Sequence, residues 1–315
     1  MPDEVETMFY VGRTPWHGKG VEVAEEDTFD IKKCLQASGL DWPVNIYPCY
    51  ARVEYGGYLE IPSFATVREL DNTLLGVVGT RYTPLQNIDA FSIFQPFLDT
   101  EMVRLHTAGS LFNGKRVWIL AKIGLNPIEI VKHDYIERYI LLSHSHDGSL
   151  KINFGFTPIR VVCANTLAMA LSDKLSKILR IKHTKNAMAT LEVARETINI
   201  FNNEFETTAA QYKYLASRQI NKNDLEKYIK TVFEVKEEPL STRMSNIVNK
   251  VMEYSFTSPG NNLSAVSGTR WAAYNAVTYY LNYDYGRTDD SRLDALWFGK
   301  SANVSNRALA IALKD

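Results

Sequence analysis

The sequence predicts an α+β fold, in which an antiparallel β-sheet of hairpins with a long packing helix is followed by an all-helical C-terminal region. Three turn signals, Asp71-Asn72, Asn113-Gly114 and Asp147-Gly148, lie between segments of strand character. One helical segment interrupts these hairpins and no βαβ unit repeats, which favours an antiparallel sheet. After about residue 186 the apolar residues recur every three or four positions, the spacing of an α-helix.

The change of pattern places a soft boundary between residues 1–186, an α+β core domain with an irregular N-terminal segment, and residues 187–315, a helical region. No low-complexity linker marks this boundary, so it can equally be a change of layer within one domain. Residues 1–60 are rich in Gly and Pro and are expected to be irregular, apart from a short helix at Asp30–Ala37.

The first two hairpins are assigned from the segments on either side of their turn signals. The expected strands are Phe64–Arg68 with Leu74–Val78, and Leu105–Phe112 with Val117–Ala121. Between the two hairpins, Asn87 begins a helix with an apolar stripe that includes Phe91 and Phe94.

The third hairpin leads into a predicted amphipathic helix with a basic tail. Thr157 offers a hydroxyl that can cap the first N–H groups, and Pro158 has the fixed φ of a first helical residue. One face of this helix is apolar at helical spacing: Ile159, Val162, Cys163, Thr166, Leu167, Ala170 and Leu171.

The C-terminal region is expected to consist of successive helices. A long apolar stripe runs through Met188, Leu191, Ala194, Ile198, Phe201, Phe205, Ala209 and Tyr212. Further helices are expected at Asn223–Phe233, Leu240–Tyr254, Thr269–Tyr283 and Leu293–Phe298, with a closing segment at Asn303–Lys314.

Charge is segregated along the chain although the net charge is only −1. Residues 1–30 contain eight acidic and two basic side chains, whereas residues 148–186 contain seven basic side chains and one acidic. Such segregation can create a local field that the overall sum hides, or it can reflect two ordinary solvated faces.

The basic segment and its neighbouring hairpin form the predicted nucleic-acid site, because cations can follow a phosphate backbone. The predicted contact residues are Lys115, Arg116, Lys151, Arg160, Lys174, Lys177, Arg180, Lys182 and Lys185. Phe154 and Phe156 alternate with polar residues along their strand, so we assign these rings to the core rather than to base stacking.

His144 and His146 are the only clustered metal-ligand types, and positions i and i+2 of a strand share one face. No third ligand can be named, so we predict no metal and no cofactor. The chain has no phosphate-loop, dinucleotide, nucleophile-elbow or zincin motif, so we predict no catalytic residue. Three cysteines without paired spacing, an acidic start and the lack of a long apolar run favour a soluble, cytoplasmic protein with no membrane segment.

An aromatic-rich helix is expected near the C-terminus, with Trp271, Tyr274, Tyr279, Tyr280 and Tyr283 between Arg270 and Arg287. Aromatic and Arg enrichment suits a protein interface, and it suits a helix packed into a core equally well.

Several segments together resemble the phage- and plasmid-associated proteins built on domain of unknown function 932. The resembling segments are Glu6–Met8, Thr14–Gly18, Leu75–Gly79, Tyr82–Asn87, Thr107–Leu111, Arg116–Trp118, Ser145–Ser149 and Thr157–Leu167. The resemblance implies occurrence in phages, plasmids and integrated elements, without an assigned activity. The order of hairpin then helix is similar, in arrangement alone, to the phage single-strand annealing proteins of the Redβ, RecT and Erf group, which oligomerise.

Three functions follow as hypotheses. The first is a mobile-element protein that binds single-stranded DNA non-catalytically, in annealing or recombination, as a homo-oligomer. The second is a protein-interaction factor that inhibits a host defence protein through the acidic segment 1–30 and the aromatic helix. The third is a metal-dependent enzyme that uses His144 and His146.

Overall fold

The structure is a computed structural model. It describes residues 5–12, 20–160, 165–166, 178–196, 198–235, 239–285, 295–296 and 299–314. The chain forms two compact units. Unit 1 comprises Met1–Gly124, Tyr139–Phe156 and Ile178–Asn199, and unit 2 comprises Leu125–Arg138, Thr157–Lys177 and Ile200–Asp315. The units interleave along the chain, and a separable boundary near residue 186 stays a prediction.

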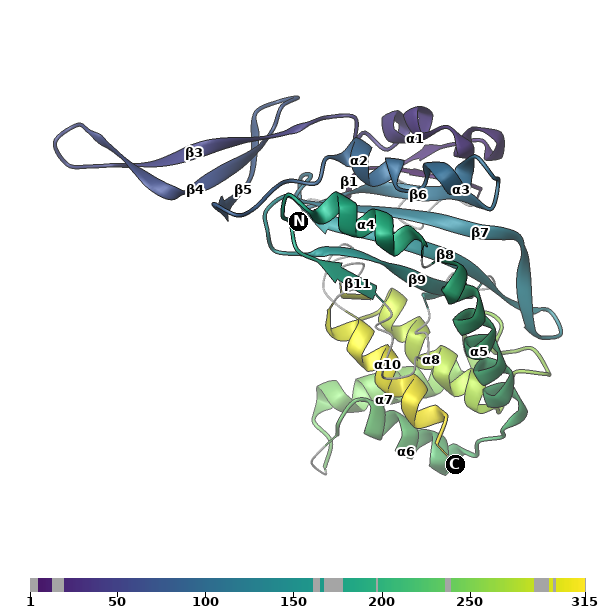
Figure 1. The fold of residues 1–315 in the computed structure, drawn as a ribbon. Coiled ribbons are helices and arrows are strands. Elements are labelled where there is room, and N and C mark those ends of the chain that lie inside the picture. Colours follow the sequence, from purple (N-terminus) through teal and green to yellow (C-terminus); the bar gives the residue numbers. More distant parts are fainter. Residues whose placement is uncertain are drawn as a thin grey trace. The chain divides into compact units, whose positions relative to one another are not determined.

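The main sheet has the strand order β10-β9-β8-β7-β6-β1-β2, with β11 also paired to β9 (Figure 1). Its strands are β1 (Val5–Tyr10), β2 (Val21–Glu22), β6 (Val103–Leu111), β7 (Arg116–Val131), β8 (Asp134–Ser145), β9 (Ile152–Arg160), β10 (Asn165–Thr166) and β11 (Ile178–Ile181). Pairing is antiparallel at β1–β6, β6–β7, β9–β10 and β9–β11, and parallel only at the short β1–β2 contact. The predicted antiparallel sheet is therefore confirmed.

Short helices cover the β1–β6 part of this sheet. They are α1 (Ile31–Ala37), which follows the 3₁₀ turn η1 (Glu25–Phe29), and α2 (Asn87–Ser92) and α3 (Gln95–Leu98). Asp30 caps α1 by accepting a hydrogen bond from the Lys33 N–H at 3.1 Å. Phe91 and Phe94 are fully buried, as the apolar stripe predicted.

A second sheet has three antiparallel strands, β3 (Val44–Arg52), β4 (Tyr58–Arg68) and β5 (Thr73–Gly79). The β4–β5 hairpin confirms the first turn signal, where Asn72 has a φ of 59°. In contrast, the expectation of irregular structure over residues 1–60 is wrong, because β1, β3 and the start of β4 lie there. The Gly and Pro residues that suggested irregular structure are compatible with these strands. Gly56 and Gly57 form the β3–β4 turn, and Pro48 lies in the edge strand β3, where proline is tolerated.

The predicted helix beginning at Thr157 is also wrong, because Thr157–Arg160 continues β9. Of the residues after Arg160 in the predicted helix and its basic tail, 165–166 form β10 and 178–181 form β11, and residues 161–164 and 167–177 lie outside the description. Pro158 fits a strand here for a local reason. β11 pairs with β9 at residues 152–155 and β10 at residues 159–160, so on this side of β9 no described residue pairs with Pro158.

The predicted C-terminal helices are present as α4 (Ala187–Glu196), α5 (Ile198–Ser217), α6 (Lys222–Val232), α7 (Thr242–Thr257), α8 (Arg270–Tyr283) and α10 (Lys300–Ala312). Most of the expected helix 293–298 lies outside the described residues. In unit 2, α8 packs on α7 and α10. Its Trp271 and Tyr274 are fully buried and enclose Tyr212 of α5, with ring centroids 4.8 and 6.0 Å away. The helical part of unit 2 thus has an aromatic core.

Candidate nucleic-acid interface

The turn between β8 and β9 is held rigidly by its own polar side chains. The Asp147 carboxylate accepts a hydrogen bond from the Ser149 N–H at 2.8 Å. The Ser145 hydroxyl accepts from the Leu150 N–H at 2.9 Å and donates to the Leu150 carbonyl at 3.1 Å. Gly148 has a φ of 76°, a conformation that favours glycine. The Asp147-Gly148 signal is therefore a correct turn prediction with a closed hydrogen-bond pattern.

The charge of Asp147 is partly compensated where it lies. Burial acts to raise the pKa of this carboxyl, but hydrogen bonds from Ser149 and Ser145, and the nearby Arg116 guanidinium, hold the pKa below its usual value. Asp147 therefore remains ionised at neutral pH, and these neighbouring groups partly compensate its negative charge.

Three other segments of unit 1 lie against this turn. From the β6–β7 turn, the Lys115 carbonyl accepts a hydrogen bond from the His146 N–H at 2.7 Å, and Arg116 Nη2 lies 3.3 Å from Ser149 Oγ. From the loop after β5, the Tyr82 hydroxyl donates to the Ser145 carbonyl at 2.7 Å. The third segment is β11 with the residues after it: β11 pairs with β9 where the turn ends, and the His183 carbonyl accepts a hydrogen bond from the Thr83 N–H of the loop after β5 at 3.2 Å.

Beneath the turn lies a cluster of three buried histidines. His144 and His146 have ring centroids 4.8 Å apart, and His183 lies 6.1 Å from His144. Trp42 covers His146 at 5.4 Å, and Tyr82 stacks on His183 at 4.8 Å. The aromatic rings of this cluster pack beneath the turn.

Burial sets the protonation of this cluster. It lowers the pKa of His146 to about 3 and that of His183 to about 4, and it lowers the pKa of His144 well below its usual value. His146 Nε2 lies 3.0 Å from Asn87 Oδ1, whereas neither ring nitrogen of His144 has a hydrogen-bond partner in the described part of the chain. The three rings are thus neutral packing groups at pH 7.

The histidines do not form a recognisable metal site. Within the described ranges, no group of three His, Cys, Asp or Glu side chains is arranged to hold a metal ion. The two histidines at alternate strand positions do share a location, as predicted, and their third neighbour is the imidazole of His183.

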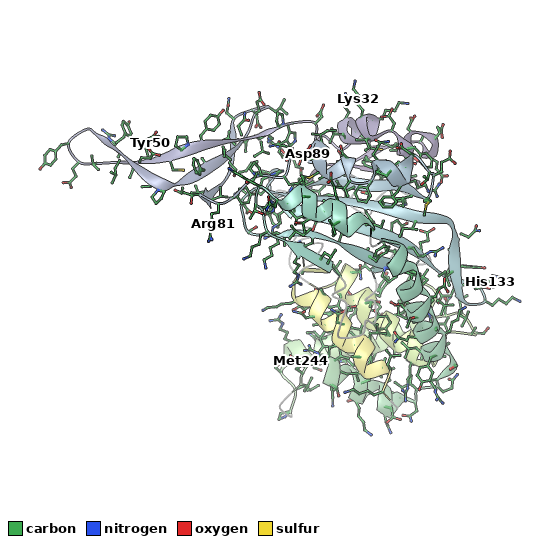
Figure 2. The ribbon with its side chains drawn as sticks, viewed as in Figure 1. Lys32, Tyr50, Arg81, Asp89, His133 and Met244 are labelled. Carbon is green, nitrogen blue, oxygen red and sulfur yellow. The ribbon has the colours of Figure 1, made fainter. Side chains whose placement is uncertain are left out.

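Seven cations lie on the turn or on the segments that contact it, and we call them the basic rim: Arg81, Lys115, Arg116, Lys151, Arg180, Lys182 and Lys185. Arg81, Lys151, Arg180, Lys182 and Lys185 are exposed, and Lys115 and Arg116 are half-buried. Figure 2 shows the Arg81 side chain extending from the loop that follows β5.

The β9–β11 ladder accounts for the closeness of two of these cations. Ile181 pairs with Ile152 in antiparallel register, so the next residue of one strand, Lys182, lies across from the preceding residue of the other, Lys151. The other rim residues lie on the segments whose contacts with the turn, or with one another, are described above. Four distant stretches of sequence therefore contribute to one rim.

Few carboxylates oppose the rim. Among the four rim segments (79–84, 112–116, 145–151 and 178–186), Asp147 is the only acidic residue. The Arg68 guanidinium lies beside Gly114 of the β6–β7 turn and pairs with Glu6 and Asp71 at 2.7 Å each. Within the described residues, no ion pair to the six rim cations other than Arg116 is found. Their positive charge is thus directed toward solvent.

The structure brings together six of the nine predicted contact residues. Lys115, Arg116, Lys151, Arg180, Lys182 and Lys185 belong to the rim, but as residues of turns and strands rather than of a helix. Arg160 lies in β9 with its side chain outside the description, and Lys174 and Lys177 lie outside the described residues. Sequence reasoning missed Arg81, because a lone Arg in a loop has no spacing signal that ties it to a site some 70 residues away.

The features behind the protein-interaction hypothesis are partly engaged in contacts within their own units. Glu6 is held by Arg68, Glu25 pairs with Arg104 at 2.7 Å and Asp27 pairs with Lys33. The acidic segment is therefore partly compensated within unit 1. In unit 2, Trp271 and Tyr274 of α8 are fully buried core residues, whereas Tyr279 and Tyr283 are half-buried.

Comparison with known proteins gives the family and no more. Fold and rim together define an α+β protein whose first unit carries a cationic surface. The chain belongs to the family described as Domain of unknown function (DUF932), which it matches over residues 74–297. No curated protein and no solved structure matches the chain significantly. No helix in the described residues has the length and apolar character to cross a membrane.

Proposed function

We propose that this protein binds single-stranded DNA non-catalytically through the basic rim, as a phage or plasmid protein that acts in the host cytoplasm in annealing or recombination. The observation that carries the proposal is the convergence of seven cations from four segments around one turn that contains a single carboxylate. Phosphate contacts of this kind supply most of the affinity of proteins that bind nucleic acid without sequence readout.

The shape of the rim favours a single strand over a duplex. Reading a duplex usually requires a helix or a paired ribbon that enters the major groove. The rim consists of three turns or loops and the end of the β9–β11 ladder, so its cations come from separate backbone segments rather than from one helix or ribbon. A flexible strand can follow such points with successive phosphates.

The test compares rim variants with matched controls by fluorescence anisotropy. Lys151→Gln combined with Lys182→Gln removes the two facing cations and keeps side-chain length. Lys213→Gln combined with Lys222→Gln removes the same charge from exposed positions of α5 and α6 in unit 2. We expect a labelled oligonucleotide of about 30 nucleotides to bind the rim variant roughly tenfold more weakly than wild type, and to bind the control unchanged.

Two results would overturn the proposal. One is a wild-type protein that does not bind the oligonucleotide even at low salt. The other is an equal loss of affinity in the rim and control variants, which would assign binding to overall charge rather than to the rim. Circular dichroism of each variant checks that the fold is retained.

A further inference from the structure

The end of the β3–β4 hairpin is a two-stranded ribbon, which we call the arm and define as residues 46–61. β5 pairs with β4 only from Ser63 to Arg68, whereas β3 pairs with β4 as far as the Arg52–Tyr58 pair. Beyond Ser63 the ribbon therefore has two strands, as Figure 1 shows for β3 and β4. Such a ribbon has marginal stability in water unless another surface packs on it.

The arm exposes apolar side chains on both of its faces. Tyr47, Tyr50, Tyr55 and Tyr58 are 50, 53, 98 and 74% exposed, and Ile46, Val53 and Leu59 are 43, 45 and 60% exposed. Figure 2 shows Tyr50 on the arm, away from the helices of unit 1. Exposed apolar groups that are scattered singly are ordinary on protein surfaces, but seven within 16 consecutive residues mark an interaction site.

The charge of the arm opposes nucleic acid as its partner. The arm contains one cation, Arg52, and two carboxylates, Glu54 and Glu60. Its tyrosines could stack on bases, but a phosphate strand would meet a net negative charge and release no counterions there. The arm therefore differs in kind from the basic rim.

The β4 edge of the arm is open to another strand. Along Tyr58–Pro62, no strand of the described chain pairs on the side opposite β3. The arm also lacks lysine, a residue that commonly protects exposed edges. A second copy would present the same edge in antiparallel direction about a two-fold axis, with Arg52 of one copy available to a carboxylate of the other.

The area of the arm suits a stable contact. At about 200 Å² for a fully exposed aromatic side chain, the four tyrosines present on the order of 550 Å². The three aliphatic side chains, at roughly 100 Å² each when fully exposed, add about 150 Å². The total, counted over both faces of the arm, approaches the roughly 800 Å² per partner of a standard protein interface, so a stable contact must cover both faces.

We propose that the arm is a self-association element, through which two copies of this chain join by the β4 edge and apolar faces of their arms. The contact is isologous, so each arm both supplies and receives the same side chains. It is independent of the basic rim and forms without nucleic acid.

The test is sedimentation velocity of the full chain from about 1 to about 100 μM without nucleic acid. Wild type is expected to form dimers with rising concentration. Leu59→Glu places a carboxylate in the contact and is expected to weaken dimerisation roughly tenfold to a hundredfold. The matched control is Leu70→Glu, since Leu70 is 74% exposed in the β4–β5 turn, outside the arm, and this variant should sediment as wild type.

A second variant tests whether loss of dimerisation in Leu59→Glu results only from its added charge. Replacing both Tyr50 and Tyr58 by Ser removes exposed aromatic area without changing charge, and it should also weaken dimerisation. A wild type that stays monomeric throughout, or arm variants that associate as wild type does, would overturn the proposal. Oligonucleotide binding by monomers that disappears with Leu59→Glu would assign the arm to nucleic acid instead, and would also overturn it.

Discussion

At the scale of single residues, the histidine cluster shows how burial changes the role of a side chain. His144 and His146 are ligand types by sequence, yet in the fold they are buried packing groups beneath the β8–β9 turn. Desolvation penalises a charged imidazole, and the three histidines lie too close to one another to hold charge together. This cost connects the stability of unit 1 to pH.

We predict that the stability of the protein falls as the pH is lowered from about 6.5 toward 4. The folded-state pKa of His146 is about 3 and that of His183 about 4, below the unfolded value near 6.5. In that window the unfolded chain takes up protons that the folded chain resists, so the contribution is complete above pH ~6.5 and is lost below it. The loss is up to about 1.4 kcal/mol per pH unit for each buried imidazole.

Urea unfolding between pH 7 and pH 5, about the range in which unfolded histidines titrate, measures this effect. His144→Leu should flatten the dependence, because it removes one titrating group that has no hydrogen-bond partner in the described chain. His133→Gln, at an exposed position, is the control and should leave the slope unchanged. Equal slopes for wild type and His144→Leu would contradict the burial argument.

At the scale of elements, β9 shows the limit of local signals. Thr157 and Pro158 satisfy the rules for a helix start, but pairing with β8 on one side and with β10 and β11 on the other makes this segment a strand. The turn signals predicted the structure correctly. Asn113 and Gly114 both adopt positive φ, which few other residues accept at low cost. Turn chemistry is local, whereas strand pairing depends on partners far away in sequence.

The contact between β5 and the β8–β9 turn depends on one glycine. A Cβ at Gly76 would lie 2.5 Å from Asp147 Cα, a backbone atom that cannot move aside without shifting the turn. We expect Gly76→Ala to destabilise the protein by about 1–3 kcal/mol, as overpacking does elsewhere. Gly79→Ala in the same strand is the control, since nothing lies within 4 Å of its Cβ position. Thermal unfolding of both variants measures the difference in stability, and equal melting temperatures for Gly76→Ala and Gly79→Ala would refute the close contact.

At the scale of the whole molecule, the net charge of −1 conceals opposing surfaces. The acidic side chains of residues 1–30 are partly matched by Arg68, Arg104 and Lys33 inside unit 1. The rim cations other than Arg116 have no such match among the described residues. A field that is local in this way acts on a ligand even when the molecule as a whole is nearly neutral.

We therefore predict a steep salt dependence for oligonucleotide binding. If about five rim cations contact phosphates, the logarithm of the affinity should fall with the logarithm of salt concentration with a slope near −3.5. Between about 50 and 200 mM salt this is a loss of roughly 100-fold. Anisotropy titrations at several salt concentrations measure the slope, and the Lys151→Gln, Lys182→Gln variant should reduce it by about 1.4. A slope near zero would exclude phosphate contacts as the source of affinity.

By itself the sequence determined the antiparallel α+β class, the three hairpin turns and the C-terminal helices, because these follow from local backbone preference and periodicity. Only the tertiary structure decided that Thr157–Arg160 is a strand, that Arg81 joins the rim, that the histidines are buried and that the arm is exposed. Each of these depends on which distant segments pair and on which groups lose water, and neither is encoded in a short window of residues.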